Sequence, residues 1–409
     1  MKNFGAIHRT LGACVTIAIV ALPAGCGNNS SQGASSLPAA QSVRRATITE
    51  RVEHNFEGAP KDGAYPQGGV FGVDGDVYVT TARGGAGSCD RGLGCGTLAV
   101  FSCCGGFRVF YSFSGYDGAV PRATFLFEPE PYGGTLFGTT ELGGAANHGT
   151  VFRVYEHRSV RLLYSFRDNP DGRRPFGSLV GGKQDVYGTT AAGGAYGKGT
   201  VYEMNEESEA EKVLHSFGKG ADGAAPLSAL TYINGELYGT TSAGGTSRKG
   251  TVFEIGKSGS ETLIHSFAGG SDGADPVASL IDVNGALYGT TSAGGTSNEG
   301  VVFEVTTSGH EKVLHSFAGG TDGASPQGPL VDVNGTLYGT TCQGGAGSNG
   351  TFFSITSGGA ETVLYDFTGT PDGSCPRGNL YLAGSTTLWG ATLEGGSSDL
   401  GAVFSISLP

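Results

Sequence analysis

Residues 279–317 read SLIDVNGALYGTTSAGGTSNEGVVFEVTTSGHEKVLHSF. The stretch contains four short segments rich in aromatic and β-branched residues, and the pair Asn284-Gly285 separates the first two. Such a pair between two apolar runs is a strong hairpin signal. A Gly-Gly loop follows the second segment and a Ser-Gly turn follows the third. The stretch therefore predicts a four-stranded antiparallel unit.

The same unit recurs seven times along the chain with a period of about 50 residues. Its Tyr-Gly-Thr-Thr element, with small variations, begins at Tyr78, Phe137, Tyr187, Tyr238, Tyr288, Tyr338 and Trp389. An Asp-Gly-x-x-Pro element begins at Asp62, Asp117, Asp171, Asp222, Asp272, Asp322 and Asp372. Four strands in a period of this length are typical of a β-propeller blade.

The two ends of the chain indicate how the repeats close. The seventh repeat ends after its third strand, and residues 50–56 align with the fourth strand at 311–317. An N-terminal strand that completes the last blade would remove an exposed sheet edge. We therefore predict an all-β, seven-bladed β-propeller over residues 46–409, with a β-solenoid as the alternative.

These repeats resemble the GloVer-type bacterial tandem-repeat proteins, whose members carry differing surface anchors. The resemblance covers residues 46–409 and implies export and anchoring, but no known activity. A looser similarity to kelch repeats carries no function, because the glycine doublet is displaced and Trp389 is the only tryptophan.

The N-terminus has the pattern of a secretion signal. Lys2 and Arg9 precede an apolar run at 11–22, which is too short to span a bilayer. Small residues then lead to Cys26, as in bacterial lipoprotein signals, and a Ser, Gly and Asn-rich stretch follows. We expect residues 1–25 to be removed, Cys26 to be lipidated and 26–45 to form a tether. Gly27 favours the outer membrane or cell surface, and ordinary cleavage with secretion is the alternative.

The chain has a net charge of −12, which opposes non-specific binding to nucleic acid. Its remaining cysteines fit an oxidising compartment. We predict disulfides between Cys89 and Cys95 and between Cys342 and Cys375, and assign no role to Cys103 or Cys104. No zinc-type spacing is present, so we expect no metal and no cofactor.

Residues that recur in every repeat are interpreted as architectural. The position two before the strand-ending Phe holds a histidine or a tyrosine, and we assign it to packing. These residues are His54, Tyr111, Tyr164, His215, His265, His315 and Tyr365. The Asp-Gly pairs are interpreted as turns, with a ring of carboxylates that binds Ca²⁺ at the channel mouth as the alternative.

Residues that break the repeat are the candidates for function. The Gly-Gly and Asp-Gly-x-x-Pro loops should emerge on one face, which propellers generally use for binding. Its candidate residues are Arg83, Arg91, Glu141, His148, Arg173, Arg174, Tyr196 and Glu394. Further non-repeated side chains of this face are Asp90, Arg122, Lys198, Gln343, Arg377 and Asp399.

No nucleophile elbow, phosphate loop or HExxH motif is present in the sequence. The leading hypothesis is accordingly an anchored, monomeric binding module for a carbohydrate or a protein. One alternative is a polysaccharide lyase or hydrolase that uses His148, or two carboxylates among Glu141, Glu394 and Asp399. A structural cell-surface protein is the other alternative.

Overall fold

The computed structural model describes residues 48–102, 106–128, 134–155, 159–181 and 185–408. The chain divides between residues 45 and 46, and every described residue belongs to the second unit. The expected signal, the Cys26 lipidation site and the tether lie outside the described residues, as do Cys103 and Cys104.

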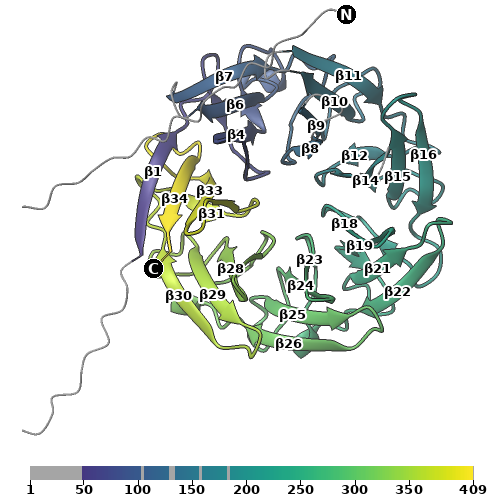
Figure 1. The fold of residues 1–409 in the computed structure, drawn as a ribbon, viewed down its shortest axis with the longest axis vertical. Helices are drawn as coiled ribbons and strands as arrows, with labels where there is room; N and C mark the ends of the chain where they lie inside the picture. Colours follow the sequence, from purple (N-terminus) through teal and green to yellow (C-terminus); the bar gives the residue numbers. More distant parts are fainter. Residues whose placement is uncertain (1–47, 103–105, 129–133, 156–158, 182–184, 409) are drawn as a thin grey trace, which may run out of the picture. The chain divides into compact units, whose positions relative to one another are not determined.

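The second unit is a ring of seven antiparallel sheets, which we number as blades 1 to 7 along the chain (Figure 1). The prediction of a seven-bladed β-propeller is confirmed. The strands of each blade are given from the centre outward. Blade 1 consists of β3 (Val70–Val73), β4 (Asp76–Thr81), β6 (Thr97–Ser102) and β7 (Gly106–Ser112), and blade 2 of β8 (Leu126–Glu128), β9 (Thr135–Thr140), β10 (Thr150–Tyr155) and β11 (Ser159–Ser165). Blade 3 consists of β13 (Val180–Gly181), β14 (Asp185–Ala192), β15 (Thr200–Asn205) and β16 (Glu211–Ser216).

Blades 4 to 7 repeat the pattern. Blade 4 consists of β18 (Thr231–Ile233), β19 (Glu236–Thr241), β21 (Thr251–Ile255) and β22 (Glu261–Ser266), and blade 5 of β23 (Ile281–Val283), β24 (Ala286–Thr291), β25 (Val301–Thr306) and β26 (Glu311–Ser316). Blade 6 consists of β27 (Val331–Val333), β28 (Thr336–Thr341), β29 (Thr351–Thr356) and β30 (Glu361–Asp366). Blade 7 consists of β32 (Tyr381–Ala383), β33 (Thr387–Glu394), β34 (Ala402–Ser407) and β1 (Thr49–Asn55).

Strand β1 closes the ring as the sequence predicts. It pairs with β34 in antiparallel register, from Thr49 opposite Ser407 to Asn55 opposite Ala402. The N-terminal strand thus completes the last blade, and β34 has a neighbour on both sides.

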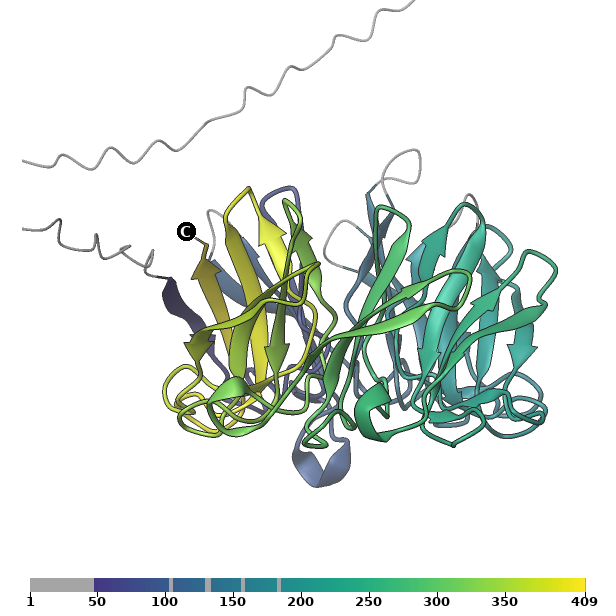
Figure 2. The same ribbon diagram turned by 90° about the horizontal axis from the view of Figure 1, so that it is seen from below.

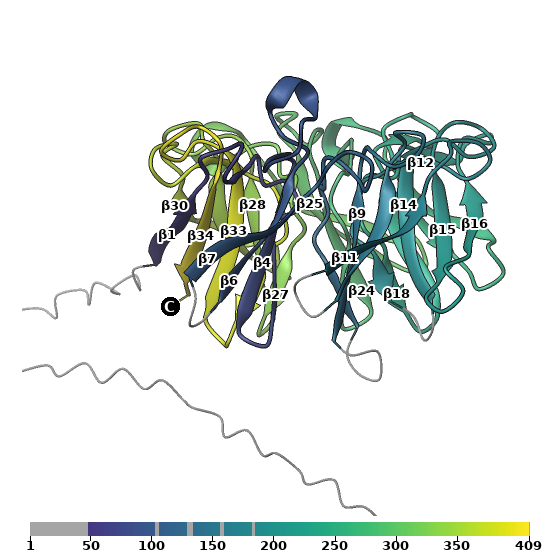
Figure 3. The ribbon, with the colours of Figure 1, turned by 90° about the horizontal axis from the view of Figure 1, so that it is seen from above.

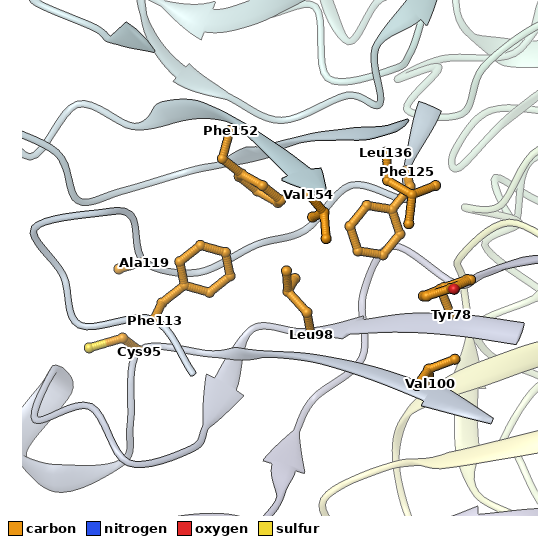
Figure 4. Packing of buried hydrophobic residues seen from close by; sticks show 10 residues of the cluster. All are labelled: Tyr78, Cys95, Leu98, Val100, Phe113, Ala119, Phe125, Leu136, Phe152 and Val154. Atoms are coloured by element: carbon orange, nitrogen blue, oxygen red, sulfur yellow. The ribbon is translucent and has the colours of Figure 1, made fainter. Parts of the chain in front are cut away.

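Buried aromatic rings join each blade to the next. The Phe that directly follows each outer strand is fully buried in every blade. In six blades this ring packs edge-on against an aromatic ring in the third strand of the following blade, with centroids 4.9–5.3 Å apart. Figure 4 shows one such interface, where Phe113 of blade 1 faces Phe152 of blade 2 beside Leu98 and Val154. Burial of a phenylalanine contributes about 1.5–3 kcal/mol, so these contacts are a major part of what holds the ring together.

The loops that begin with the Asp-Gly and Gly-Gly elements lie together, as expected. β2 (Gly63–Ala64) pairs with β5 (Arg83–Gly84), and β17 (Gly223–Ala224) pairs with β20 (Ala243–Gly244). Two of the Asp-Gly loops even add a short strand to their own blade, namely β12 (Arg173–Pro175) and β31 (Ser374–Pro376). These loops form one face of the ring, from which η1 (Asp90–Gly92), drawn in blue, projects (Figures 2 and 3).

Across the described ranges, the helices are three short 3-10 turns: η1, η2 (Gly270–Asp272) and η3 (Gly320–Asp322). None of them has the length or the apolar character needed to cross a membrane.

Candidate functional site

The centre of the ring contains a cavity of about 210 Å³, which we call the axial cavity. It is lined by the residues that directly follow the proline of the Asp-Gly-x-x-Pro element, so that all seven blades contribute. The first residues after these prolines are Gln67, Arg122, Phe176, Leu227, Val277, Gln327 and Arg377.

The axial cavity has a polar side and an apolar side. Arg377, Gln67 and Arg122 come from the consecutive blades 7, 1 and 2, whereas Phe176, Leu227 and Val277 come from blades 3, 4 and 5. The repeat fixes where each side chain begins, and the variable residue type decides the local chemistry. A group that is charged at one end and apolar at the other matches this lining.

A larger cavity of about 770 Å³ opens on the loop face above blades 7, 1 and 2, and we call it the loop cavity. Gln67 and Arg122 line both cavities, which therefore adjoin. The remaining residues of the loop cavity are Tyr65, Ala82, Arg83, Cys89, Asp90, Gly94, Ala119, Val120, Glu141, Leu142, Asn147, Leu393 and Glu394.

A buried carboxylate organises the floor of the loop cavity. Glu141 is only 3% exposed, and its two oxygens accept from different arginines. The Nε of Arg122 donates to Oε2, and the Nε of Arg174 donates to Oε1 at 2.9 Å. Arg122 also donates to the Oε1 atom of Gln67 and stacks over the Phe176 ring, 4.9 Å from its centroid. These contacts hold the Arg122 guanidinium in place at the junction of the two cavities.

Arg377 is different, because its guanidinium lacks such partners. Among the described residues, none forms a hydrogen bond or an ion pair within 4.0 Å with the Arg377 side chain. Burial lowers the pKa of Arg377, and the nearby positive charge of Arg122 lowers it further, while Glu394 acts in the opposite direction. The disulfide between Cys342 and Cys375 ties the preceding segment to blade 6, two residues before Arg377.

The wall of the loop cavity in blade 1 is built by an insertion. The disulfide between Cys89 and Cys95 closes this insertion, which contains η1. Arg83 forms an ion pair with Asp90 at 2.6 Å across it. Both disulfides have the pairing that the sequence predicted.

The structure brings together some of the candidate residues and separates others. Arg83, Glu141 and Glu394 line the loop cavity, and Arg174 reaches it through Glu141. The other candidates, Arg91, His148, Arg173 and Tyr196, are absent from the lining of both cavities. Arg173 pairs instead with Asp168 at 3.3 Å.

The catalytic alternatives gain no geometric support. His148 does not line either cavity. Asp399 accepts a hydrogen bond from the Gly395 amide at 3.0 Å, which is a turn contact. Of the three carboxylates considered for glycoside chemistry, only Glu141 and Glu394 share a cavity, and both Glu141 oxygens are occupied by arginines.

The Asp-Gly carboxylates do not form a ring at the channel mouth, so the alternative to the turn interpretation was wrong. Each one binds the His or Tyr near the end of an outermost strand, for example Asp222 to His215 at 3.0 Å and Asp171 to Tyr164 at 2.8 Å. The turn directs the carboxylate outward because that is where its partner lies. The His or Tyr side chain, which we assigned to packing, therefore also forms a hydrogen bond with the aspartate.

Two of these outer contacts have the composition of a cation site. His265, Asp272 and Glu311 form one group and His315, Asp322 and Glu361 form another, with ligand atoms within 4.8 Å of each other. In three other blades a tyrosine takes the place of the histidine and donates to the equivalent aspartate. A tyrosine keeps the hydrogen bond to the aspartate but does not replace the histidine as a metal ligand. This substitution favours a structural role for the His, Tyr and Asp contacts in all seven blades.

Sequence reasoning missed Tyr65, Gln67 and Asn379 as lining residues. Gln67 directly follows its proline, where other blades carry arginine, glutamine or an apolar residue. Asn379 is the third residue after its proline, where other blades carry a small residue or proline. An alignment of the seven repeats would mark Gln67 as variable, but the position becomes interesting only once it is known to face the axis.

Comparison with known proteins places the chain within a repeat family and a fold. No curated protein sequence matches it significantly. The oligogalacturonate lyase from Vibrio parahaemolyticus has a TM-score of 0.53 at 9% identity, covering 89% of this chain and 97% of the lyase. The extracellular domain of a one-component system from B. thetaiotaomicron has a TM-score of 0.53 at 11% identity, covering 86% of this chain and 40% of that chain.

A puromycin-hydrolyzing peptidase from Mycobacterium tuberculosis has a TM-score of 0.51 at 13% identity, covering 87% of this chain and 54% of the peptidase. At these identities the similarities show the propeller fold and no shared chemistry. The sequence pattern of the Gloeobacter/Verrucomicrobia repeat family, in contrast, matches residues 26–253 and 232–409. The chain belongs to the Gloeobacter/Verrucomicrobia repeat family.

Proposed function

We propose that this protein is an exported lipoprotein of the outer membrane or cell surface whose propeller binds a saccharide in the loop cavity. The observation that carries the binding proposal is the composition of this cavity. Its 770 Å³ lie within the usual range for small-molecule sites. Export and anchoring are supported by the sequence that leads up to Cys26.

The polar groups of the loop cavity suit a ligand with many hydroxyl groups. A sugar hydroxyl both donates and accepts, so its site needs groups of both kinds. Arg83 and Arg122 supply donors, Glu394 and Asp90 supply acceptors, and Asn147 and Gln67 supply both. Ala119, Val120, Leu142 and Leu393 provide apolar surface between them.

The described surface favours a saccharide over a protein partner. Its large exposed apolar side chains are Leu93, Tyr116, Tyr196, Tyr232 and Leu263. They are scattered over blades 1, 3 and 4 and the loop that leads into blade 2. The buried core of a protein interface is generally apolar and rich in aromatic residues, whereas saccharide sites can be concave and polar.

A binding experiment with a matched pair of variants tests this proposal. We would screen the purified protein against neutral and acidic oligosaccharides by thermal shift, and measure affinities of the hits by calorimetry. Glu394→Ala should weaken binding about ten-fold, which is about 1.4 kcal/mol. Gln343→Ala is the control, because Gln343 occupies the same repeat position in blade 6 and lines neither cavity.

The outcomes separate clearly. A saccharide that binds wild type and Gln343→Ala alike, but Glu394→Ala weakly, would support a site in the loop cavity. Equal binding by both variants would place the saccharide elsewhere. Absence of any saccharide hit would refute the proposed function.

A further inference from the structure

The axial cavity contains a positive charge with no protein partner. Arg377 forms no hydrogen bond or close ion pair with another described side chain, although burial and the neighbouring Arg122 both disfavour its charged form. Arg377 is half-buried, and such a cation without a close partner costs free energy, which the charge of Glu394 only partly offsets. Proteins retain such strain mainly at functional sites, where a ligand supplies the missing partner.

Arg122 stands beside Arg377 and is held in place. Its Nε donates to Glu141 and its Nη1 to Gln67, while its face packs on Phe176. The axial cavity thus presents one fixed guanidinium and one guanidinium free to bind. A guanidinium carries N–H donors in a planar fork that matches the two oxygens of a carboxylate.

The opposite side of the axial cavity is apolar. Leu227 and Val277 come from blades 4 and 5, on the other side of the ring from Arg377, and Phe176 beside them packs against the Arg122 guanidinium. A fully hydrated inorganic anion gains nothing from such a wall. A carboxylate attached to a sugar ring would place its charge on Arg377 and its C–H groups against the apolar residues.

The two cavities share Gln67 and Arg122, so one ligand can extend through both. We propose that the axial cavity binds the carboxylate of a hexuronic acid residue through Arg377 and Arg122, while the rest of an acidic oligosaccharide occupies the loop cavity. This inference rests on the proposed function and specifies the class of saccharide. It assigns to Arg377 the selection of acidic over neutral sugars.

The test uses the purified protein and the variant Arg377→Gln. Glutamine is the natural residue at the same repeat position in blades 1 and 6, as Gln67 and Gln327, so the variant should fold. Because Arg377 has no side-chain partner to lose, the melting temperature without ligand should stay at or above that of wild type. Arg248→Gln is the charge-matched control, since Arg248 is exposed in a loop of blade 4 and lines neither cavity.

The probes are hexuronic acid trimers of gluco, galacto and manno configuration, their carboxyl-reduced neutral counterparts, and inorganic sulfate. We expect one acidic trimer to bind wild type and Arg248→Gln equally, and its neutral counterpart to bind at least about ten-fold more weakly. Arg377→Gln should lose at least about ten-fold in affinity for the acidic trimer and little for the neutral one. Arg377→Lys keeps the charge without the fork and should lie in between.

Three results would overturn the inference. Equal binding of acidic and neutral trimers, unchanged in Arg377→Gln, would remove the carboxylate site and leave saccharide binding intact. A stabilisation by sulfate as large as that by the trimer, and dependent on Arg377, would reassign the site to free anions. Failure of every saccharide to bind would refute the proposed function and this inference together.

Discussion

At the residue scale, one glycine shows how the repeat packs. Gly289 in the second strand of blade 5 lies opposite Phe303 in the third strand. A Cβ atom on Gly289 would lie 2.6 Å from the Cζ atom of Phe303, closer than van der Waals contact allows. Blade 1 reverses the sizes at these two positions, since Val79 there lies opposite Ala99.

This exchange predicts a compensating pair of substitutions. Gly289→Val alone should destabilise the protein by about 1–3 kcal/mol through overpacking. Phe303→Ala alone should cost about 3–5 kcal/mol through the cavity it leaves. The double variant recreates the pair of blade 1 and should cost less than the sum, as measured by a double-mutant cycle in urea. Strict additivity would show that the two side chains do not compensate each other.

The sequence shows the unusual Val79 in its Tyr-Val-Thr-Thr element, but it does not show the reason for it. The reason is Ala99, which lies in another strand. Only the pairing register reveals that a large and a small residue have changed places. Single repeats therefore predict strands well and side-chain packing between strands poorly.

At the scale of elements, a glutamate of one blade contacts polar side chains of its neighbour at five of the seven blade interfaces. The glutamate that begins an outer strand reaches the His or Tyr of the preceding blade and the Asp of the loop that follows it, as Glu311 reaches His265 and Asp272. The equivalent residues at the two other interfaces are Phe107 and Val160. Burial, followed by the charge of Asp272 and a hydrogen bond to it, raises the pKa of Glu311 to about 7.

This raised pKa gives the stability a defined dependence on pH. The folded protein keeps the Glu311 proton up to about pH 7, whereas an unfolded chain releases it near the usual value of 4.5. The contribution is complete below the lower value and is lost as the pH rises through the upper one. Glu311→Gln mimics the protonated form, so it should be more stable than wild type at pH 8, by on the order of 1 kcal/mol after solvent screening is considered.

At pH 5 the Glu311→Gln variant and wild type should unfold at nearly the same urea concentration. Glu207→Gln, at an exposed turn position, is the control and should show no such pH-dependent gain. If the difference in unfolding free energy between Glu311→Gln and wild type stayed constant from pH 5 to pH 8, Glu311 would not have a raised pKa in the folded protein.

The outer carboxylates also show where sequence reasoning failed. The turn at Asp-Gly was predicted correctly, whereas the alternative, a ring of carboxylates at the channel mouth, was wrong about the direction of the side chains. The direction of each aspartate depends on its partner seven or eight residues away for most blades, such as His54 for Asp62 and Tyr365 for Asp372. A turn motif fixes the backbone, whereas the direction of its side chain follows from the strand beside it.

At the scale of the whole molecule, closure of the ring creates the candidate site. The loop cavity joins Arg83 of blade 1 to Glu394 of blade 7, which lie near opposite ends of the sequence. The sequence identified both as loop residues that break the repeat. It could not select them over Arg91 or Tyr196, because their proximity exists only after the ring closes.

The closure itself can be tested with a pair of cysteines. Thr49 of β1 and Ser407 of β34 are both exposed and lie directly opposite each other. The double variant Thr49→Cys/Ser407→Cys should form a disulfide that links the two ends of the propeller, identified by non-reducing peptide mapping. Because it closes a very long loop, this bond should stabilise the protein by about 2–4 kcal/mol relative to its reduced form.

The same double variant under mild reduction provides the matched control. The gain in melting temperature should disappear when the new disulfide opens, provided that the two native disulfides remain intact in the same sample. If the new cysteines instead remained free or paired between molecules, β1 would not complete blade 7. Arg83 and Glu394 would then lack the closed ring that brings them together, and the loop cavity would lose its basis.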